Sequence, residues 1–444
     1  MIDTKARRRR VWWIAGGLAV VLAAAAGVAV TAWPATPAPV AAAPASPSPV
    51  VTVEPVKLKR PAASAPRSQW QAWVGQEAEA AMKRQSAALL AGDFAGFTAD
   101  ALPGAKAELG RRYRSLRSLH VTRFEQSVGG NPWPPAEAGG DWRVETLVDH
   151  CLVEKECAAD YAYFDSMWRI TPQGLRLAGY HVYDEATTCF DCTGGSHTFS
   201  RPWETTELVA RAGRRTLVAV PLAYRSRLAD LSRRAEAAAA VADRYTVGEG
   251  RVDRYRVFLA DAASWKRWYR GNPGSWVAGW AVPTGRDRIE TEVLASEMTP
   301  GYSDELLRHE LAHVSTLRND SYYGKNDVWW LVEGMADHVA LAGNPQGTAQ
   351  ERQDLHRYLR SHNLTTVAVP HPPDDASNDD AGGRYAVGYY ALHYLIAKYG
   401  QKAALAFFQQ AVQQGIGLEG AAISSLHKPW SQVNRECVAA VRKA

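Results

Sequence analysis

The hydrophobic pattern of the chain divides it into regions. Between residues 69 and 90 the apolar positions recur at helical spacing, and a shorter helix is predicted over 104–113. Apolar and polar residues then alternate in short runs separated by Gly, Pro and charged turns, which predicts strands at 119–128, 142–153, 158–171 and 175–183. Helices followed by consecutive strands predict an α+β domain over 68–200, in which one face of an antiparallel sheet packs against the helices.

A second pattern begins at residue 201. A strand over 214–220 and an alanine-rich, charged helix over 223–245 are assigned to a connecting segment, 201–250. Further strands are predicted at 254–259, 275–282 and 288–296, and the rest of the chain has helical periodicity. We therefore expect a small sheet followed by a mainly helical domain over 251–444.

The N-terminal residues differ from both regions. Basic residues cluster at 5–10, and the uncharged stretch 11–33 is long enough for one tilted transmembrane helix. Because positive charge favours the cytoplasmic side, residues 1–33 are expected to be a cytoplasmic tail and single-pass cell-membrane anchor, with the remainder extracytoplasmic. A cleaved signal peptide is the alternative, and would make the protein secreted. Residues 34–67, rich in Pro and Ala, are predicted to be a linker.

Composition limits the class of protein without identifying it. A chain of 444 residues with 46% hydrophobic content can form two or three packed domains. The formal net charge of +5 arises partly from the basic cluster at 5–10, so it indicates no nucleic-acid-binding surface.

The five cysteines are expected to lie outside the cytoplasm, in an oxidising compartment where disulfides form. Cys151 and Cys157 flank a predicted turn, so a hairpin would place their sulfur atoms opposite each other. Cys189 and Cys192 form a C-x-x-C that could close a small loop. A zinc site made from these four cysteines is the alternative. Cys437 is left over and is expected to be a buried thiol.

His309, Glu310 and His313 form the sequence H-E-x-x-H within 304–317, where the apolar periodicity predicts a helix. Residues four apart on a helix lie on one face, so the two imidazoles can bind one zinc ion with Glu310 beside them as a general base. A chance match on a solvated helix face is the alternative, which makes the third ligand decisive.

The third ligand is predicted twenty residues beyond His313. Glu333 follows two tryptophans and Leu331, and a carboxylate among apolar neighbours is explained if a cation neutralises it. Asp337 is four residues further on, faces the same way, and can accept a hydrogen bond from a zinc-bound histidine. Two histidines and one glutamate leave the fourth position of a catalytic zinc site open for water.

H-E-x-x-H at 309–313 and W-L-V-E-G-M-A at 330–336 together resemble the gluzincin metallopeptidases, including the thermolysin-like and M1-aminopeptidase-like branches. The resemblance implies one zinc ion per chain bound by His309, His313 and Glu333, with Glu310 as base and Asp337 behind the ligands. The sequence Y-x-x-G that begins at Tyr385 is similar to a helix of the M1-like branch, which implies that Tyr385 hydrogen-bonds the oxyanion of the tetrahedral intermediate.

The region before this domain, 68–200, is similar to the NTF2-like fold in the segments 87–93 and 168–171. Such folds enclose pockets, act as spacers or bind partners, so the resemblance leaves its role open.

One departure bears on specificity. M1 aminopeptidases carry a G-x-M-E-N strand whose glutamate holds the substrate amino terminus, and the nearest segment here, Ser296-Glu297-Met298-Thr299, does not match. A sheet edge above a zinc site can hold an extended peptide by strand addition. The sequence therefore favours a membrane-anchored zinc endopeptidase acting on peptides or proteins. The alternative is a membrane-tethered binding module in which the NTF2-like domain carries the function and the zinc site is structural or inactive.

Overall fold

The computed structural model describes residues 56–137, 139–157, 161–181, 200–248, 250–268, 277–285, 288–318, 326–373 and 375–444. The predicted membrane anchor at 11–33, most of the linker, and Cys189 and Cys192 lie outside these residues. Within the described residues, no helix combines the length and apolar character needed to cross a bilayer. The anchor therefore stays a prediction.

The first region contains the expected two-layer α+β arrangement. Its elements are α1 (Arg67–Ala91), α2 (Phe94–Thr98), α3 (Pro103–Ser118), β1 (Val121–Val128), β2 (Trp142–Leu152), β3 (Tyr161–Thr171) and β4 (Gly174–His181). The strands form an antiparallel meander in the order β1-β2-β3-β4. Gly92 ends α1 with a left-handed backbone (φ 77°), which a residue without Cβ adopts at low cost.

Alternation along β2 explains how this sheet packs. Trp142, Val144 and Val148 are buried at every second or fourth position, and they share one core with Val74 of α1 and Leu109 of α3. The helices thus cover one face of the sheet, as period-two patterning requires.

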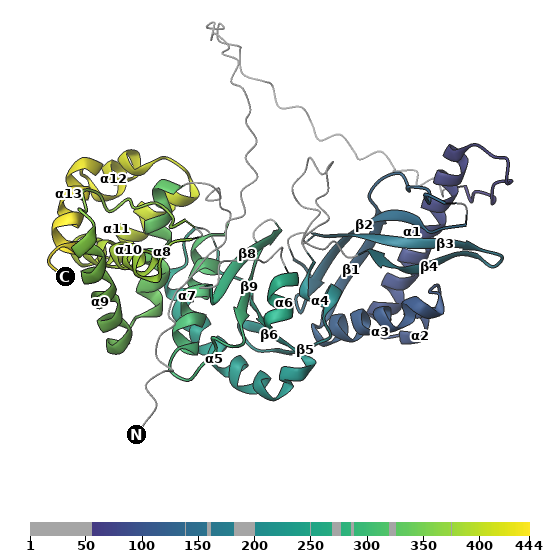
Figure 1. Ribbon diagram of the computed structural model, residues 1–444, viewed down its shortest axis with the longest axis horizontal. Helices are drawn as coiled ribbons and strands as arrows, with labels where there is room; N and C mark the ends of the chain where they lie inside the picture. The colour runs from purple at the N-terminus through teal and green to yellow at the C-terminus, as the bar shows by residue number, and fades with distance from the viewer. Residues whose placement is uncertain are drawn as a thin grey trace, which may run out of the picture.

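A second sheet occupies the middle of the molecule (Figure 1). It is preceded by α4 (Pro202–Thr205) and comprises β5 (Leu208–Ala212), β6 (Thr216–Pro221), β7 (Tyr255–Ala260), β8 (Gly279–Gly285) and β9 (Arg288–Leu294), with α5 (Leu228–Ala242) and α6 (Ala262–Arg267) between strands. The strand order is β5-β6-β7-β9-β8, with β6, β7 and β9 parallel and the two edge strands antiparallel. The segment 201–250, predicted as a connection, supplies β5, β6 and α5.

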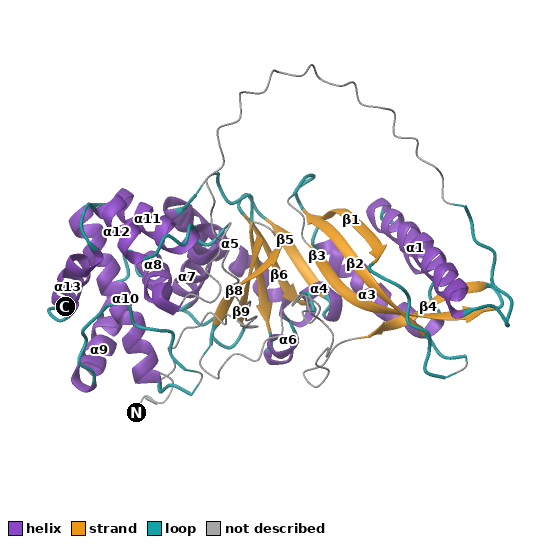
Figure 2. Cartoon of the chain, turned by 90° about the horizontal axis from the view of Figure 1, so that it is seen from above, coloured by secondary structure: helices purple, strands orange, loops and turns teal. Residues whose placement is uncertain are grey.

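Both faces of the second sheet are covered. Val218 and Val257 face the core formed with α5 and the C-terminal helices, whereas Ala219 and Phe258 face a core continuous with the first region. Every residue of β6 and β7 is buried, as expected of parallel strands between two layers. Figure 2 shows the sheet between these two parts.

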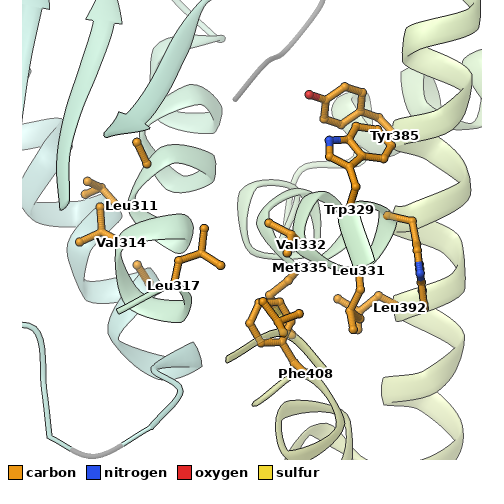
Figure 3. Packing of buried hydrophobic residues seen from close by; sticks show 14 of the residues in the cluster. Leu311, Val314, Leu317, Trp329, Leu331, Val332, Met335, Tyr385, Leu392 and Phe408 are labelled. Carbon is orange, nitrogen blue, oxygen red and sulfur yellow. The ribbon is translucent and has the colours of Figure 1, made fainter. Parts of the chain in front are cut away.

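The rest of the described chain is helical. It contains α7 (Ser303–Thr316), α8 (Trp329–Ala340), α9 (Pro345–Ser361), α10 (Asn378–Tyr399), α11 (Gln401–Phe408), α12 (Leu418–Leu426) and α13 (Trp430–Val441). Apolar side chains of α7, α8 and α10, including Leu311, Met335 and Leu392, belong to one core (Figure 3).

Cys151 and Cys157 form a disulfide, as we predicted from the turn between them. This pairing excludes a zinc site that uses all four cysteines. Glu154, inside the disulfide loop, accepts a hydrogen bond from Nε of Arg254 at 2.7 Å and so ties the loop to the second sheet next to β7. Cys437 is a free, buried thiol.

Candidate metal centre

The central helix of the site, α7, extends from Ser303 to Thr316. Asp304 and Glu305 lie in its first turn, where negative charge stabilises a helix N-terminus. The helix is buried along most of its length, and His309, Glu310 and His313 have no exposed surface. A solvated helix face is therefore ruled out for H-E-x-x-H.

Glu333 reaches the same point from α8. Its Oε2 lies 3.4 Å from Nε2 of His309 and 3.5 Å from Nε2 of His313, and the two Nε2 atoms are 3.1 Å apart. Ligand atoms bonded to a tetrahedral zinc ion at about 2.0–2.1 Å lie roughly 3.3 Å from one another. The three atoms thus match one face of a zinc coordination tetrahedron, and two imidazoles with one carboxylate are a donor set that catalytic zinc uses.

A cation would balance the buried carboxylates at this point. Burial raises the pKa of Glu333, but the imidazoles of His313 and His309 outweigh it and lower the pKa to about 2. Among the described residues, neither oxygen of Glu310 has a hydrogen-bond partner, and Glu333 has only the contacts of 3.4 and 3.5 Å between its Oε2 and the two imidazoles. Buried carboxylates without donors are costly unless a metal ion or proton neutralises them, so a zinc ion fits the residues present.

Asp337 lies behind His309, one of the candidate ligands. Its Oδ1 lies 2.9 Å from Nδ1 of His309, and it is 1% exposed. A proton on Nδ1 donated to this carboxylate leaves Nε2 of His309 with its lone pair toward Glu333 and His313.

Glu310 lies between the ligand helix and the second sheet. A Cβ built on Gly279 of β8 would come within 2.7 Å of its Oε1, so the carboxylate lies against the backbone of that strand. Burial raises the pKa of Glu310 to about 8, with the carboxylates of Glu333 and Asp337 adding to the effect and His309 opposing it. A carboxylate whose pKa is raised toward neutrality is suited to accept and return a proton.

Tyr385 lies on α10 and is 1% exposed. Its ring packs edge-on against Trp329 with centroids 5.0 Å apart, and its centroid is 6.5 Å from that of His309. Figure 3 shows Tyr385 beside Trp329. The structure thus places Tyr385 next to His309, one of the candidate metal ligands.

A glycine contact fixes α10 against α8. A Cβ on Gly388 would meet the carbonyl oxygen of Trp330 at 2.4 Å, and one on Gly334 would meet the carbonyl oxygen of Gly388 at 2.4 Å. Only residues without side chains allow this approach. The contact joins the turn that follows Tyr385 to the residue after Glu333, and therefore sets the tyrosine relative to the ligands.

Three of these neighbours were not predicted from the sequence: Gly279, Gly334 and Trp329. A glycine inside a strand can indicate close approach of another group, and Gly279 within the predicted strand 275–282 was such a signal. The segment Ser296-Glu297-Met298-Thr299, which does not match the G-x-M-E-N strand in sequence, follows β9 and lies outside the strands. The edge strand nearest Glu310 is β8.

Neither the known protein families nor the curated proteins contain a sequence match to this chain. Solved structures with some likeness include native yeast LTA4 hydrolase (13% identity, TM-score 0.34, 67% of this chain and 63% of that chain). Yeast LTA4 hydrolase in complex with bestatin is 17% identical at a TM-score of 0.30, over 46% of this chain and 33% of that one. An M1 zinc metallopeptidase from Deinococcus radiodurans is 16% identical at a TM-score of 0.35, over 71% and 61%.

This chain therefore covers less than two thirds of the length of each of these proteins. Similarity at these TM-scores carries no argument about activity.

Proposed function

We propose that this protein is a zinc metallopeptidase. The observation that carries the proposal is the convergence of two imidazoles and one carboxylate at the spacing of zinc ligands, with the buried Glu310 beside them. A catalytic rather than structural role is supported because three protein ligands leave a coordination position open, whereas structural zinc sites use four.

Each residue has a distinct task in the proposed reaction. Zinc bound by His309, His313 and Glu333 would polarise the scissile carbonyl and increase the acidity of water. Glu310 accepts the proton of the attacking water and passes it to the leaving amine. Tyr385 donates a hydrogen bond to the oxyanion, and Asp337 keeps His309 in the tautomer that binds metal.

The edge strand β8 is the proposed substrate platform. Its inner side pairs with β9, and its other side is an edge to which no strand of the described residues is paired. An extended peptide can add to such an edge by main-chain hydrogen bonds. The strand, Gly-Trp-Ala-Val-Pro-Thr-Gly, carries no carboxylate that could hold a substrate amino terminus, which supports endopeptidase action.

The substitution Glu310→Gln tests this proposal. It keeps size and the zinc ligands but removes the proton acceptor, so we expect one zinc per chain and a fall in peptide hydrolysis of at least roughly 10³-fold. Zinc is measured by elemental analysis and activity with a quenched peptide library. Wild-type turnover by the variant, or no cleavage by a zinc-loaded wild-type chain, would overturn the proposal.

We further propose that residues 11–33 hold the enzyme at the cell membrane with its catalytic part outside the cytoplasm. The proposal is supported by the uncharged stretch after a basic cluster and by the disulfide Cys151–Cys157, which forms in oxidising compartments. Fractionation of cells producing the full-length chain or a chain lacking 1–33 tests it. Release of the full-length protein from membranes by alkaline carbonate would count against an integral anchor.

A further inference from the structure

A second buried polar cluster lies where the first region packs against α4, apart from the residues of the candidate metal centre. Arg112 of α3 is 3% exposed. Its Cζ lies 3.7 Å from the centroid of the Tyr180 ring, 4.7 Å from that of Phe164 and 6.0 Å from that of Trp203. The guanidinium therefore lies among aromatic rings contributed by β3, β4 and α4.

The polar atoms of this cluster are not satisfied. Among the described residues, Nε and Nη1 of Arg112 and Nε1 of Trp203 are buried without a hydrogen-bond partner. Nη2 of Arg112 has a long contact of 3.4 Å with Oε1 of Glu108. All three unpartnered atoms are N–H donors. A buried donor without an acceptor is costly, and more so when it is charged.

The nearby carboxylates do not supply the missing acceptor. Glu204 uses Oε1 to accept the backbone N–H of Arg201 at 2.9 Å. Burial raises the pKa of Glu204 to about 7, despite the opposing effect of Arg112, so it is a partial counter-ion at neutral pH. Glu108 is shared between two cations, because its Oε1 also lies 3.5 Å from Nη2 of Arg111.

We propose that Arg112 and Trp203 bind a small organic carboxylate with an aromatic or apolar body. The carboxylate accepts the unpartnered N–H groups and balances the guanidinium charge, for which arginine held flat on an aromatic ring is well suited. The rings of Phe164 and Tyr180 contact the apolar part. This site is independent of zinc and of peptide hydrolysis.

Benzoate is the probe, titrated calorimetrically into the full-length chain, with neutral benzamide and inorganic phosphate as comparison ligands. We expect saturable binding of benzoate and little binding of benzamide. Arg112→Met should weaken benzoate by roughly tenfold or more, because it removes both charge and donors. Trp203→Phe removes one N–H while keeping an aromatic ring, and should weaken it severalfold.

Arg111→Met is the matched control, because it removes the same charge from the next position of α3, where the side chain is 24% exposed. It should leave benzoate affinity within about twofold. The proposal is overturned if benzoate does not bind, if benzamide binds equally well, or if phosphate binds and benzoate does not. It also fails if both Arg112→Met and Trp203→Phe bind benzoate as the wild-type chain does.

Discussion

The cluster around His309 and the cluster around Arg112 are both buried and polar, but they differ in the kind of polar atom that lacks a hydrogen-bond partner. Around His309 and His313 the unsatisfied atoms include the carboxylate oxygens of Glu310 and Glu333 together with Nδ1 of His313, whereas in the described part of the chain Arg112 and Trp203 leave three N–H donors unsatisfied. Protein interiors leave few polar groups unpaired, so each cluster indicates the partner that it lacks. Buried acceptors call for a cation and buried donors for an anion. The first cluster fits zinc, and the second fits a carboxylate.

The largest expected effect comes from removing an acceptor of the metal centre. Glu333→Gln loses the anionic ligand, so we expect loss of zinc on dialysis and loss of hydrolysis. Zinc at about 1,000 times its Kd should stabilise the wild-type chain by about 4 kcal/mol, and the variant by far less. Thermal unfolding with and without added zinc measures this. One retained equivalent of zinc in the variant would mean that Glu333 is not a ligand.

The next largest effect is expected on the free energy of unfolding, when the close packing of α8 against α10 is disturbed. Gly388→Ala places a methyl group against the carbonyl of Trp330, so we expect a loss of about 2–3 kcal/mol in the free energy of unfolding. Gly382→Ala on the same helix is the control, because its Cβ would meet no atom closer than 3.4 Å, at Asp354. Urea unfolding compares the two. Equal stability of both variants would show that the Gly334–Gly388 contact does not limit the approach of α8 and α10.

A smaller effect, on zinc affinity, is expected when Asp337 is changed. Asp337→Asn keeps the shape of the hydrogen bond to His309 but removes its charge, so zinc affinity should fall by about 10–100-fold. Competition with a chelator measures the affinity. Unchanged affinity would limit the role of Asp337 to packing.

The smallest effect concerns the Arg112 side of the comparison. The pKa of Glu204 is about 7 in the folded chain against an ordinary value of 4.5. A raised pKa means that its contribution to stability is present below about pH 4.5 and is lost as the pH rises through 7. Glu204→Gln should therefore show a shallower decline in unfolding free energy over this range, by on the order of 1 kcal/mol. Parallel pH profiles for both chains would contradict this assignment.

The two clusters also differ in how far the sequence predicts them. The candidate metal centre comes from α7 and α8. Helical periodicity pairs His309 with His313 and Glu333 with Asp337, and the apolar neighbours of Glu333 indicated that the second pair belongs with the first. The cluster around Arg112 joins α3, β3, β4 and α4, and the sequence gives no local sign that Arg112 and Trp203 meet. The pairing of β3 with β4 brings Phe164 and Tyr180 together, and Arg112 and Trp203 join them through the packing of α3 and α4.

The second sheet also shows that local sequence patterns predict strands but not which strands pair. Its strands β7, β8 and β9 were predicted within a few residues, because each has its own apolar run. The parallel pairing of β6 with β7 was not predicted, since the helix α5 separates them and their partner is chosen by the tertiary fold.

The position of Pro283 in β8 has a consequence for self-association. An unpaired sheet edge invites pairing with the same edge of another molecule, and proline interrupts that pairing because it has no N–H. The ladder that any added chain can form on β8 is therefore short, extending from Gly279 to Val282 before Pro283 breaks it. A short extended peptide can therefore pair reversibly with this edge, whereas a long and stable pairing with a strand of another molecule is prevented.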